Sequence, residues 1–165
     1  GVDDSNYFAV MEGRFERSRN LRPTLRRYII DPVRGKLREE ILQDDDEYEM
    51  PFVHPAKVSV RHRYGYFAAG GQAEAFWSQI ARLDLEGGDK AYYDFGPGHY
   101  CGEPIFVPRS GGEASGYLLT LVYKDASKKS FLAVLDAEKL GAGPRAVVHL
   151  EHHAPFSFHG CWYPA

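Results

Sequence analysis

The histidine at position 159 has sequence neighbours that would suit a metal ligand. Pro155 precedes it and Gly160 follows it in residues 154–162, which read APFSFHGCW. Because proline fixes the backbone and glycine permits unusual dihedral angles, we expect His159 to be held in one pose. A fixed, neutral imidazole that is partly removed from water can donate a lone pair to a metal. A histidine among aromatic residues is more often a packed core residue, so this stretch alone leaves both interpretations open.

Two aromatic side chains close to this histidine, Phe158 and Trp162, would keep it away from bulk water. They could line the cavity of an apolar substrate, but packing in the core is the commoner role of such residues.

The other histidines give no recognisable metal site. Those in the connector, the predicted strand and the Gly/Pro loop are expected to be structural: His54, His62 and His99. Three more precede residue 159, but their spacing matches no familiar zinc pattern: His149, His152 and His153.

Composition bounds the class of protein. The chain has 165 residues, of which 44% are hydrophobic and 26% charged, as in a soluble globular domain. Its formal net charge of -3 gives no electrostatic footprint for nucleic acid, so we expect no nucleic-acid partner. No apolar run is long enough to span a bilayer, and the polar start is no signal peptide but resembles an internal cut point. We therefore expect a cytoplasmic location.

Most of the chain has the pattern of short β-strands joined by tight turns. Turn residues lie near positions 34, 87 and 126, each between two runs rich in β-branched or aromatic residues. A recurrence of about 40 to 50 residues is typical of four-stranded β-propeller blades. We therefore predict an all-β fold of antiparallel hairpins, although a β-sandwich would also give many short strands. The paired runs are residues 24–31 and 36–42, residues 76–85 and 90–95, and residues 117–123 and 130–136.

The remaining segments are assigned by composition. Strands are predicted at residues 7–11, 58–69, 103–108 and 145–150, with a connector at 50–55 and a loop at 96–102. The acidic residues 44–47 are expected to form a solvated loop, because they lack the glycine and the spacing of a calcium-binding EF-hand.

Four motifs in order resemble the C-terminal part of the carotenoid cleavage oxygenases, which include apocarotenoid and lignostilbene dioxygenases. They are EMP at residues 49–51 with RHRYGY at 61–66, DFGPG at 94–98, GEPIFVPR at 102–109, and PFSFHGCW at 155–162. The resemblance runs from about residue 24 to the end of the chain.

This resemblance implies a fold and a domain organisation. The family fold is a seven-bladed β-propeller, so residues 1–165 would form its last three blades or so. They would be the C-terminal segment of a single propeller domain that is incomplete on its own. The expected partner is the remainder of the propeller, supplied by an upstream segment or by another copy.

The resemblance also implies an iron site. In this family four histidines hold Fe(II) on the propeller axis, and glutamates orient three of the imidazoles. It implies that His159 is the last ligand and that Glu103 orients it. Glu49 matches a second such glutamate, which serves a histidine upstream of this chain. A hydrogen-bond acceptor on the second imidazole nitrogen is what a ligating histidine generally requires.

Two functions follow as expectations. The first is a part in an Fe(II)-dependent dioxygenase, which uses O2 to cleave a C=C bond of a carotenoid, apocarotenoid or stilbene-like substrate to carbonyl products. The second is a non-catalytic propeller fragment, a scaffold or binding module without a complete metal site. The apolar substrate class leaves peripheral membrane contact open. The chain alone is expected to be inactive.

The two cysteines suggest a reducing compartment, because they form no CxxC motif and no disulfide framework. Cys101 lies two residues before Glu103, and Cys161 lies two residues after His159. Contact between Glu103 and His159 could bring the thiols close, but we expect both to be reduced and structural.

Overall fold

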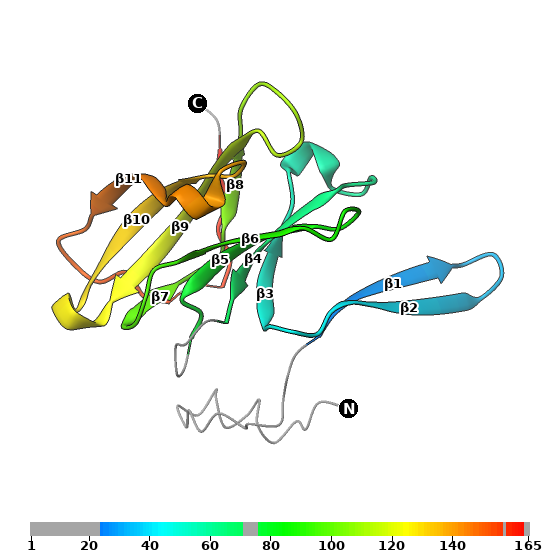
Figure 1. The fold of residues 1–165 in the computed structure, drawn as a ribbon, viewed down its shortest axis with the longest axis horizontal. Helices are drawn as coiled ribbons and strands as arrows, with labels where there is room; N and C mark the ends of the chain where they lie inside the picture. Colours follow the sequence, from blue (N-terminus) through cyan, green and yellow to red (C-terminus); the bar gives the residue numbers. More distant parts are fainter. Residues whose placement is uncertain (1–23, 71–75, 157, 164–165) are drawn as a thin grey trace, which may run out of the picture. The chain divides into compact units, whose positions relative to one another are not determined.

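Antiparallel strands make up most of the regular structure in residues 24–70, 76–156 and 158–163, the part of the chain that the computed structural model describes (Figure 1). The chain divides into two units, Gly1–Glu47 and Tyr48–Ala165, and each is described by itself.

The first unit contains one β-hairpin whose turn follows from its sequence. β1 (Leu25–Asp31) pairs with β2 (Lys36–Gln43). The Asp31 carboxylate accepts the backbone N–H groups of Val33 and Arg34 at 3.1 and 3.0 Å. Gly35 then adopts a φ of 59°, a left-handed conformation that glycine tolerates best. These contacts close the turn predicted near position 34.

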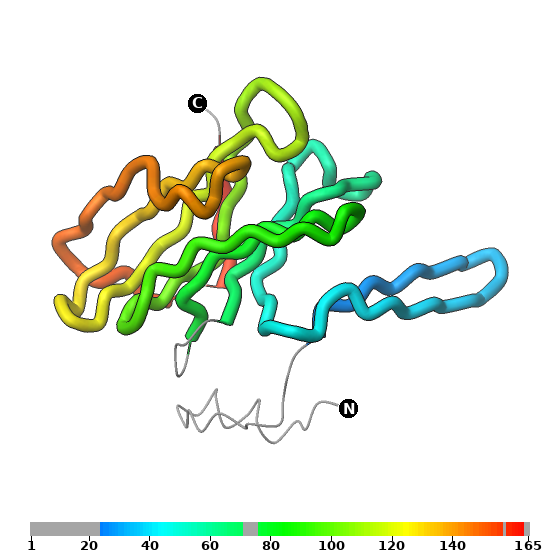
Figure 2. The backbone as a smooth tube through the Cα atoms, in the orientation of Figure 1, coloured from blue at the N-terminus to red at the C-terminus, as the bar shows by residue number. Residues whose placement is uncertain are grey.

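The second unit contains two antiparallel sheets, whose path is traced in Figure 2. In the first sheet the strand order follows the sequence. In the second, the central strand β9 pairs with β10 on one side and with two short strands, β7 and β8, on the other. The strands of the first sheet are β3 (Tyr48–Phe52), β4 (Tyr64–Ala69), β5 (Gln79–Asp84) and β6 (Lys90–Asp94). Those of the second are β7 (His99–Cys101), β8 (Ile105–Pro108), β9 (Gly116–Lys124), β10 (Lys129–Asp136) and β11 (Pro144–His149).

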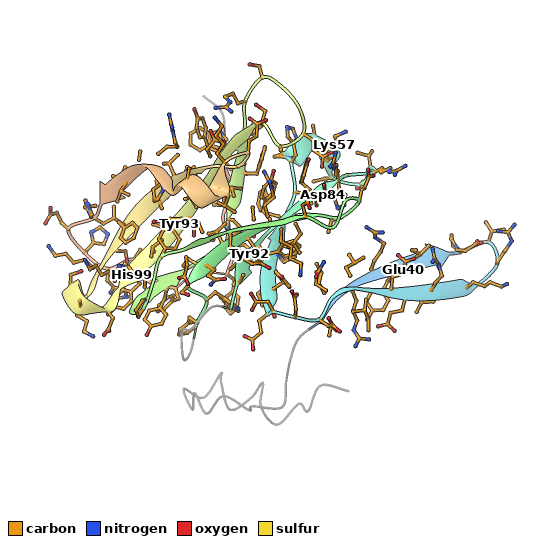
Figure 3. All side chains as sticks on the ribbon, viewed as in Figure 1. Glu40, Lys57, Asp84, Tyr92, Tyr93 and His99 are labelled. Carbon is orange, nitrogen blue, oxygen red and sulfur yellow. The ribbon has the colours of Figure 1, made fainter. Side chains whose placement is uncertain are left out.

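The hydrophobic core lies where these two sheets pack against each other. Tyr66 and Ile80 enter it from the first sheet, and Phe106, Leu118 and Leu135 enter it from the second. The rings of Tyr66 and Phe106 are 5.0 Å apart between centroids. Because strand side chains alternate between faces, one face of each sheet supplies this core. Figure 3 shows the side chains on both sheets, with Asp84 labelled at the end of β5 and Tyr92 and Tyr93 on β6.

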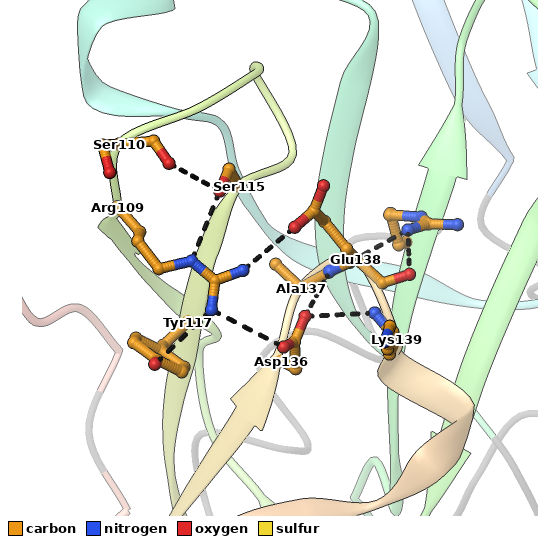
Figure 4. Close-up of polar contacts among 9 residues, drawn as sticks. Arg109, Ser110, Ser115, Tyr117, Asp136, Ala137, Glu138 and Lys139 are labelled. Atoms are coloured by element: carbon orange, nitrogen blue, oxygen red, sulfur yellow. Dashed lines mark hydrogen bonds and ion pairs between the residues drawn. The ribbon is translucent and has the colours of Figure 1, made fainter.

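Polar contacts join the ends of the two sheets (Figure 4). The Arg109 guanidinium donates to Glu138 Oε2 at 3.0 Å and lies 5.2 Å from the centre of the Tyr117 ring. Arg82, on β5, donates to the backbone carbonyls of Ala137 and Glu138, both at 3.0 Å. The turn after β10 is thereby held from both sheets.

Several local predictions are confirmed. The hairpins with turns near positions 34, 87 and 126 are all present as antiparallel pairs. The predicted short strand before residue 108 is β8, and the predicted strand at residues 145–150 is β11, shifted by one residue. The fold is all-β, as predicted. The strand predicted at residues 7–11 lies outside the described residues.

Three local predictions are wrong. Residues 58–63 do not extend β4, because Pro55 begins a 3-10 turn (Pro55–Lys57) and Ser59 has a φ of 65°, which breaks an extended strand. His62 therefore does not share a strand face with Tyr64. The loop predicted at residues 96–102 contains β7, and the connector predicted at residues 50–55 contains the end of β3. Glycine and proline in these stretches resemble a loop, but pairing with β9 and β4 makes both strands.

Candidate metal-ligand site

Glu103 lies in a break between two short strands of one sheet. β7 ends at Cys101 and β8 begins at Ile105, and both strands pair with β9. From Cys101 to Ile105 the chain advances four residues, while their partners Val122 and Leu119 are three residues apart. The extra residue makes the break a β-bulge, a feature that re-aims side chains. Glu103 can therefore leave the strand alternation.

Glu49 lies at a comparable irregularity in the other sheet. The chain advances three residues from Glu49 to Phe52, while their partners Ala68 and Tyr66 on β4 are two residues apart. Met50, which follows Glu49, has a φ of 53°. Each glutamate that the resemblance singles out thus lies at an irregularity in the strand pairing of its sheet, Glu49 within β3 and Glu103 between β7 and β8.

Glu103 contacts two successive residues of the C-terminal segment. Its Oε1 lies 3.1 Å from Nδ1 of His159, and its Oε2 accepts the backbone N–H of Gly160 at 2.7 Å. The Glu103 side chain is only 9% exposed, whereas that of His159 is 76% exposed. The carboxylate is therefore enclosed, and the imidazole extends from it into open space.

This contact determines which nitrogen of His159 is free to bind a metal. An ionised carboxylate only accepts hydrogen bonds, so it favours the tautomer of His159 that carries its proton on Nδ1. Nε2 then keeps its lone pair for a metal. The local geometry fits an imidazole that binds a metal through one ring nitrogen while a glutamate accepts a hydrogen bond from the other.

The backbone before His159 is held against the second sheet. Ser130 on β10 accepts the N–H of Leu150 at 3.0 Å through its carbonyl and that of Ala154 at 3.0 Å through its hydroxyl. The Phe156 ring stacks on that of Phe76, with centroids 4.6 Å apart. These contacts bring the segment to Glu103, 56 residues earlier in the chain.

The two aromatic residues proposed for a substrate cavity have different surroundings. Trp162 lines an apolar pocket of about 420 Å³, and Phe158 is not among its lining residues. Phe158 is 70% exposed and Trp162 is 50% exposed, so neither is packed in the core of this chain. The other residues that line the pocket are Phe52, Pro55, Phe106, Pro108 and Cys161.

The other histidines make local contacts. Nδ1 of His54 accepts the N–H of Ala56 at 3.1 Å, Nδ1 of His62 lies 3.3 Å from the Val60 carbonyl, and Nδ1 of His99 lies 3.2 Å from that of Pro97. Within the described residues, no three His, Cys, Asp or Glu side chains converge on a possible metal site.

Both cysteines are free thiols, so they form no disulfide, as expected. Cys101 is buried and its Sγ donates to the carbonyls of Trp77 and Gln79, each at 3.3 Å. Burial raises the pKa of the Cys101 thiol to about 12. Cys161 is exposed. Cys101 is therefore an inert core residue.

Reasoning from the sequence missed the part of Gly160 in this site. A backbone N–H gives no signal in the residue type, and only the fold shows that this one reaches Glu103.

Comparison with known proteins gives one family. Residues 2–164 match the family described as retinal pigment epithelial membrane protein, RPE65. Apocarotenoid-15,15'-oxygenase of Synechocystis sp. is 38% identical over 148 residues, which are 87% of this chain and 30% of that protein. The 9-cis-epoxycarotenoid dioxygenase NCED1 of Oryza sativa subsp. japonica is 34% identical over 122 residues, 68% of this chain and 19% of that protein.

Solved structures show the same likeness. The crystal structure of cobalt-substituted Synechocystis ACO has a TM-score of 0.81 and 38% identity, over 88% of this chain and 31% of that one. A crystallised ACO/RPE65 chimera has a TM-score of 0.81 and 33% identity, over 86% of this chain and 30% of that one. The chain therefore spans less than a third of the length of these relatives. The likeness confirms the expectation of part of a seven-bladed β-propeller.

Proposed function

Because this chain belongs to the family of the retinal pigment epithelial membrane protein and the carotenoid cleavage oxygenases, we propose that it forms part of an Fe(II)-dependent dioxygenase. The observation that carries the proposal is the contact between Nδ1 of His159 and Glu103, which leaves Nε2 available to a metal.

The proposed reaction is oxidative cleavage of a C=C bond in a carotenoid, apocarotenoid or stilbene-like substrate. The double bond breaks, and each of its two carbons receives one oxygen atom of O2 to become an aldehyde or a ketone. The names of the relatives, an apocarotenoid oxygenase and carotenoid cleavage dioxygenases, support this substrate class. Iron, when bound, supplies the activation of O2.

The residues of this chain would hold and orient rather than react. His159 would donate Nε2 to the iron, and Glu103 would fix the tautomer and direction of its ring. Glu49 would orient a second histidine, which the rest of the propeller would supply. The remaining ligands would come from the rest of the propeller, either an upstream segment or another copy.

The apolar pocket beside this segment supports an apolar substrate. Trp162 lines it within three residues of His159, so a conjugated chain near the metal would meet an aromatic wall. Phe158 is exposed and does not line this pocket, so a part for it in substrate binding would depend on the rest of the propeller.

The location of the protein stays a prediction. In the described part of the chain, no helix has the length and apolar character needed to cross a bilayer. A cytoplasmic location is proposed from the sequence, and peripheral membrane contact, which would let an apolar substrate enter from lipid, is proposed on the substrate class alone. Relatives include chloroplastic and bacterial proteins.

A second function, that of a non-catalytic scaffold or binding module, is favoured by one observation. No three metal-binding side chains converge within residues 24–70, 76–156 and 158–163. In the described part of the chain, His159 is the histidine that the resemblance assigns to the metal, and a single imidazole holds Fe(II) weakly.

A hybrid protein separates the two functions. This chain would replace the matched part of the Synechocystis apocarotenoid oxygenase, and iron content and cleavage of an apocarotenoid would be measured. We expect about one iron per protein, with loss of iron and activity in His159→Ala. His99→Ala is the matched control, because the Nδ1 of His99 also faces an oxygen acceptor, the Pro97 carbonyl.

A folded hybrid in which His159→Ala keeps its full iron content and cleavage would refute the ligand assignment. A folded hybrid that never binds iron would favour the scaffold. Circular dichroism of each hybrid checks that it is folded.

A further inference from the structure

We propose that Gly160 is a positioning residue, whose backbone N–H and lack of a side chain together lock the Glu103 carboxylate in the plane that orients His159. The proposal deepens the proposed function, since it rests on His159 being a metal ligand, but its central test needs no metal.

The Glu103 carboxylate can rotate unless both of its oxygens are held. The terminal torsion of a glutamate joins an sp³ and an sp² carbon, and rotation about it is broad, so one hydrogen bond at Oε1 does not fix the plane. A second donor at Oε2 does. Gly160 supplies it at 2.7 Å, a shorter contact than the 3.1 Å between Oε1 and Nδ1 of His159.

Burial of Glu103 makes the loss of the second donor destabilising. The Glu103 side chain is 9% exposed, so water has little access to replace a lost donor. A buried carboxylate oxygen that loses its partner is destabilised by its own desolvation. Without the Gly160 N–H, the carboxylate would therefore turn toward whatever donor or water it could reach, and its hold on the imidazole would weaken.

Close packing against Ile105 favours glycine at position 160. The φ of Gly160 lies outside the left-handed region, so an alanine would meet no backbone strain there. A Cβ at this position would, however, lie 2.7 Å from Cδ1 and 3.7 Å from Cγ1 of Ile105. Real Cβ atoms essentially never approach another heavy atom to 2.7 Å.

The clash between a Cβ at position 160 and Ile105 would be relieved by movement of one of the two segments. Ile105 lies on β8 and its χ1 is restricted by β-branching, so on this side only a rotation about χ2 would move Cδ1 away from the new Cβ. The described segment around residue 160 pairs with no strand, so its backbone should move more easily than that of β8. Its movement away from β8 would lengthen both contacts to Glu103. The close approach of Gly160 to Ile105 is thus what lets one carboxylate hold two successive residues.

The test follows the tautomer of His159 in the full 165-residue chain without metal, using two-bond ¹⁵N–¹H correlation spectra of the imidazole. The wild-type chain should carry its proton on Nδ1. Gly160→Ala should lower the ratio of the Nδ1–H to the Nε2–H form about fivefold, the effect of losing one hydrogen bond.

Rescue distinguishes positioning from a general structural effect. Ile105→Val removes Cδ1, the atom that the new Cβ would strike, so Gly160→Ala combined with Ile105→Val should restore the wild-type ratio. Gly112→Ala is the control, because a Cβ at Gly112 would meet nothing within 4 Å and its φ is also ordinary. Backbone amide spectra verify that each variant is folded.

An unchanged tautomer in a folded Gly160→Ala chain would overturn the proposal, and so would failure of Ile105→Val to rescue it. The hybrid enzyme separates this outcome from the proposed function. There, Gly160→Ala should weaken iron binding about 10-fold or more. A shifted tautomer with unchanged iron affinity would leave the carboxylate lock standing and count against the ligand role. Loss of iron in His159→Ala, with no tautomer shift in Gly160→Ala, would support the ligand role of His159 and overturn the carboxylate lock.

Discussion

The Arg63 guanidinium forms a bidentate ion pair with the Asp84 carboxylate. Its Nε lies 2.9 Å from Oδ1 and its Nη2 lies 2.6 Å from Oδ2. The same carboxylate accepts the backbone N–H groups of Glu86 and Gly87, which close the turn after β5. Asp84 therefore joins the entrance of β4 to the β5–β6 turn.

The Asp84 carboxylate should make the free energy of unfolding depend on pH in the acidic range. The hydrogen bond from Arg63, followed by that from the Gly87 N–H, holds the pKa of Asp84 well below its ordinary value. A lowered folded-state pKa means that the stabilisation is fully present above the unfolded pKa of about 3.9. It is lost as the pH falls from there toward the folded-state pKa.

We expect Asp84→Asn to lower the free energy of unfolding at pH 7 by about 2 kcal/mol, because the charge-assisted hydrogen bonds are lost. Between pH 5 and 3, urea unfolding of the variant should depend less on pH than that of the wild type. Asp89→Asn, an exposed carboxylate in the same turn, is the control. Parallel pH profiles for Asp84→Asn and wild type would contradict the prediction.

Gly116 should be intolerant of any side chain. A Cβ there would lie 2.5 Å from Cζ of Phe106 and 2.6 Å from the carbonyl oxygen of Val107. Because the second atom belongs to the backbone of β8, which pairs with β9, it cannot move without disturbing the sheet. We expect Gly116→Ala to lower the free energy of unfolding by about 2–3 kcal/mol. In the same urea titration Gly112→Ala should change the free energy of unfolding by less than about 0.5 kcal/mol. If the two variants lowered it equally, the close approach of Gly116 to β8 would not be the cause.

The two thiols should differ in reactivity. Cys101 is buried and its pKa is raised to about 12, whereas Cys161 is exposed. Because the thiolate is the reactive form, a thiol reagent at pH 8 should label only Cys161 in the folded chain. Both should react in denaturant, and Cys161→Ser should abolish labelling of the native chain. Rapid native labelling of Cys101 would indicate that the sheet opens around it.

The pocket beside the candidate ligand offers a matched pair of aromatic variants. Trp162 lines the pocket and Phe158 does not, although both are exposed. In the hybrid enzyme we expect Trp162→Ala to raise the KM for an apocarotenoid about 10-fold, because a large aromatic contact to the substrate is lost. Phe158→Ala should change it much less. If both variants behaved alike, the pocket would not be the substrate cavity.

Local sequence was sufficient where a short stretch dictates its own geometry. The turn around Gly35 was predictable because Asp31 and a proline–glycine pair suit a hairpin whatever surrounds them. The same local reasoning failed at residues 58–63, where valines suggest a strand but Ser59 takes a left-handed conformation. β-propensity describes a fit to a neighbouring strand, and a single sequence does not show whether that neighbour exists.

The residue types at the candidate site were determined by the sequence, and the resemblance singled out His159 and Glu103 as a pair. Only the tertiary structure decided how that pair is held. The bulge between β7 and β8, the N–H of Gly160 and the close approach of Ile105 arise from segments that are separated along the chain. The physical reason is that a hydrogen-bonded carboxylate depends on distances of tenths of an ångström, which packing between segments sets and residue type does not encode.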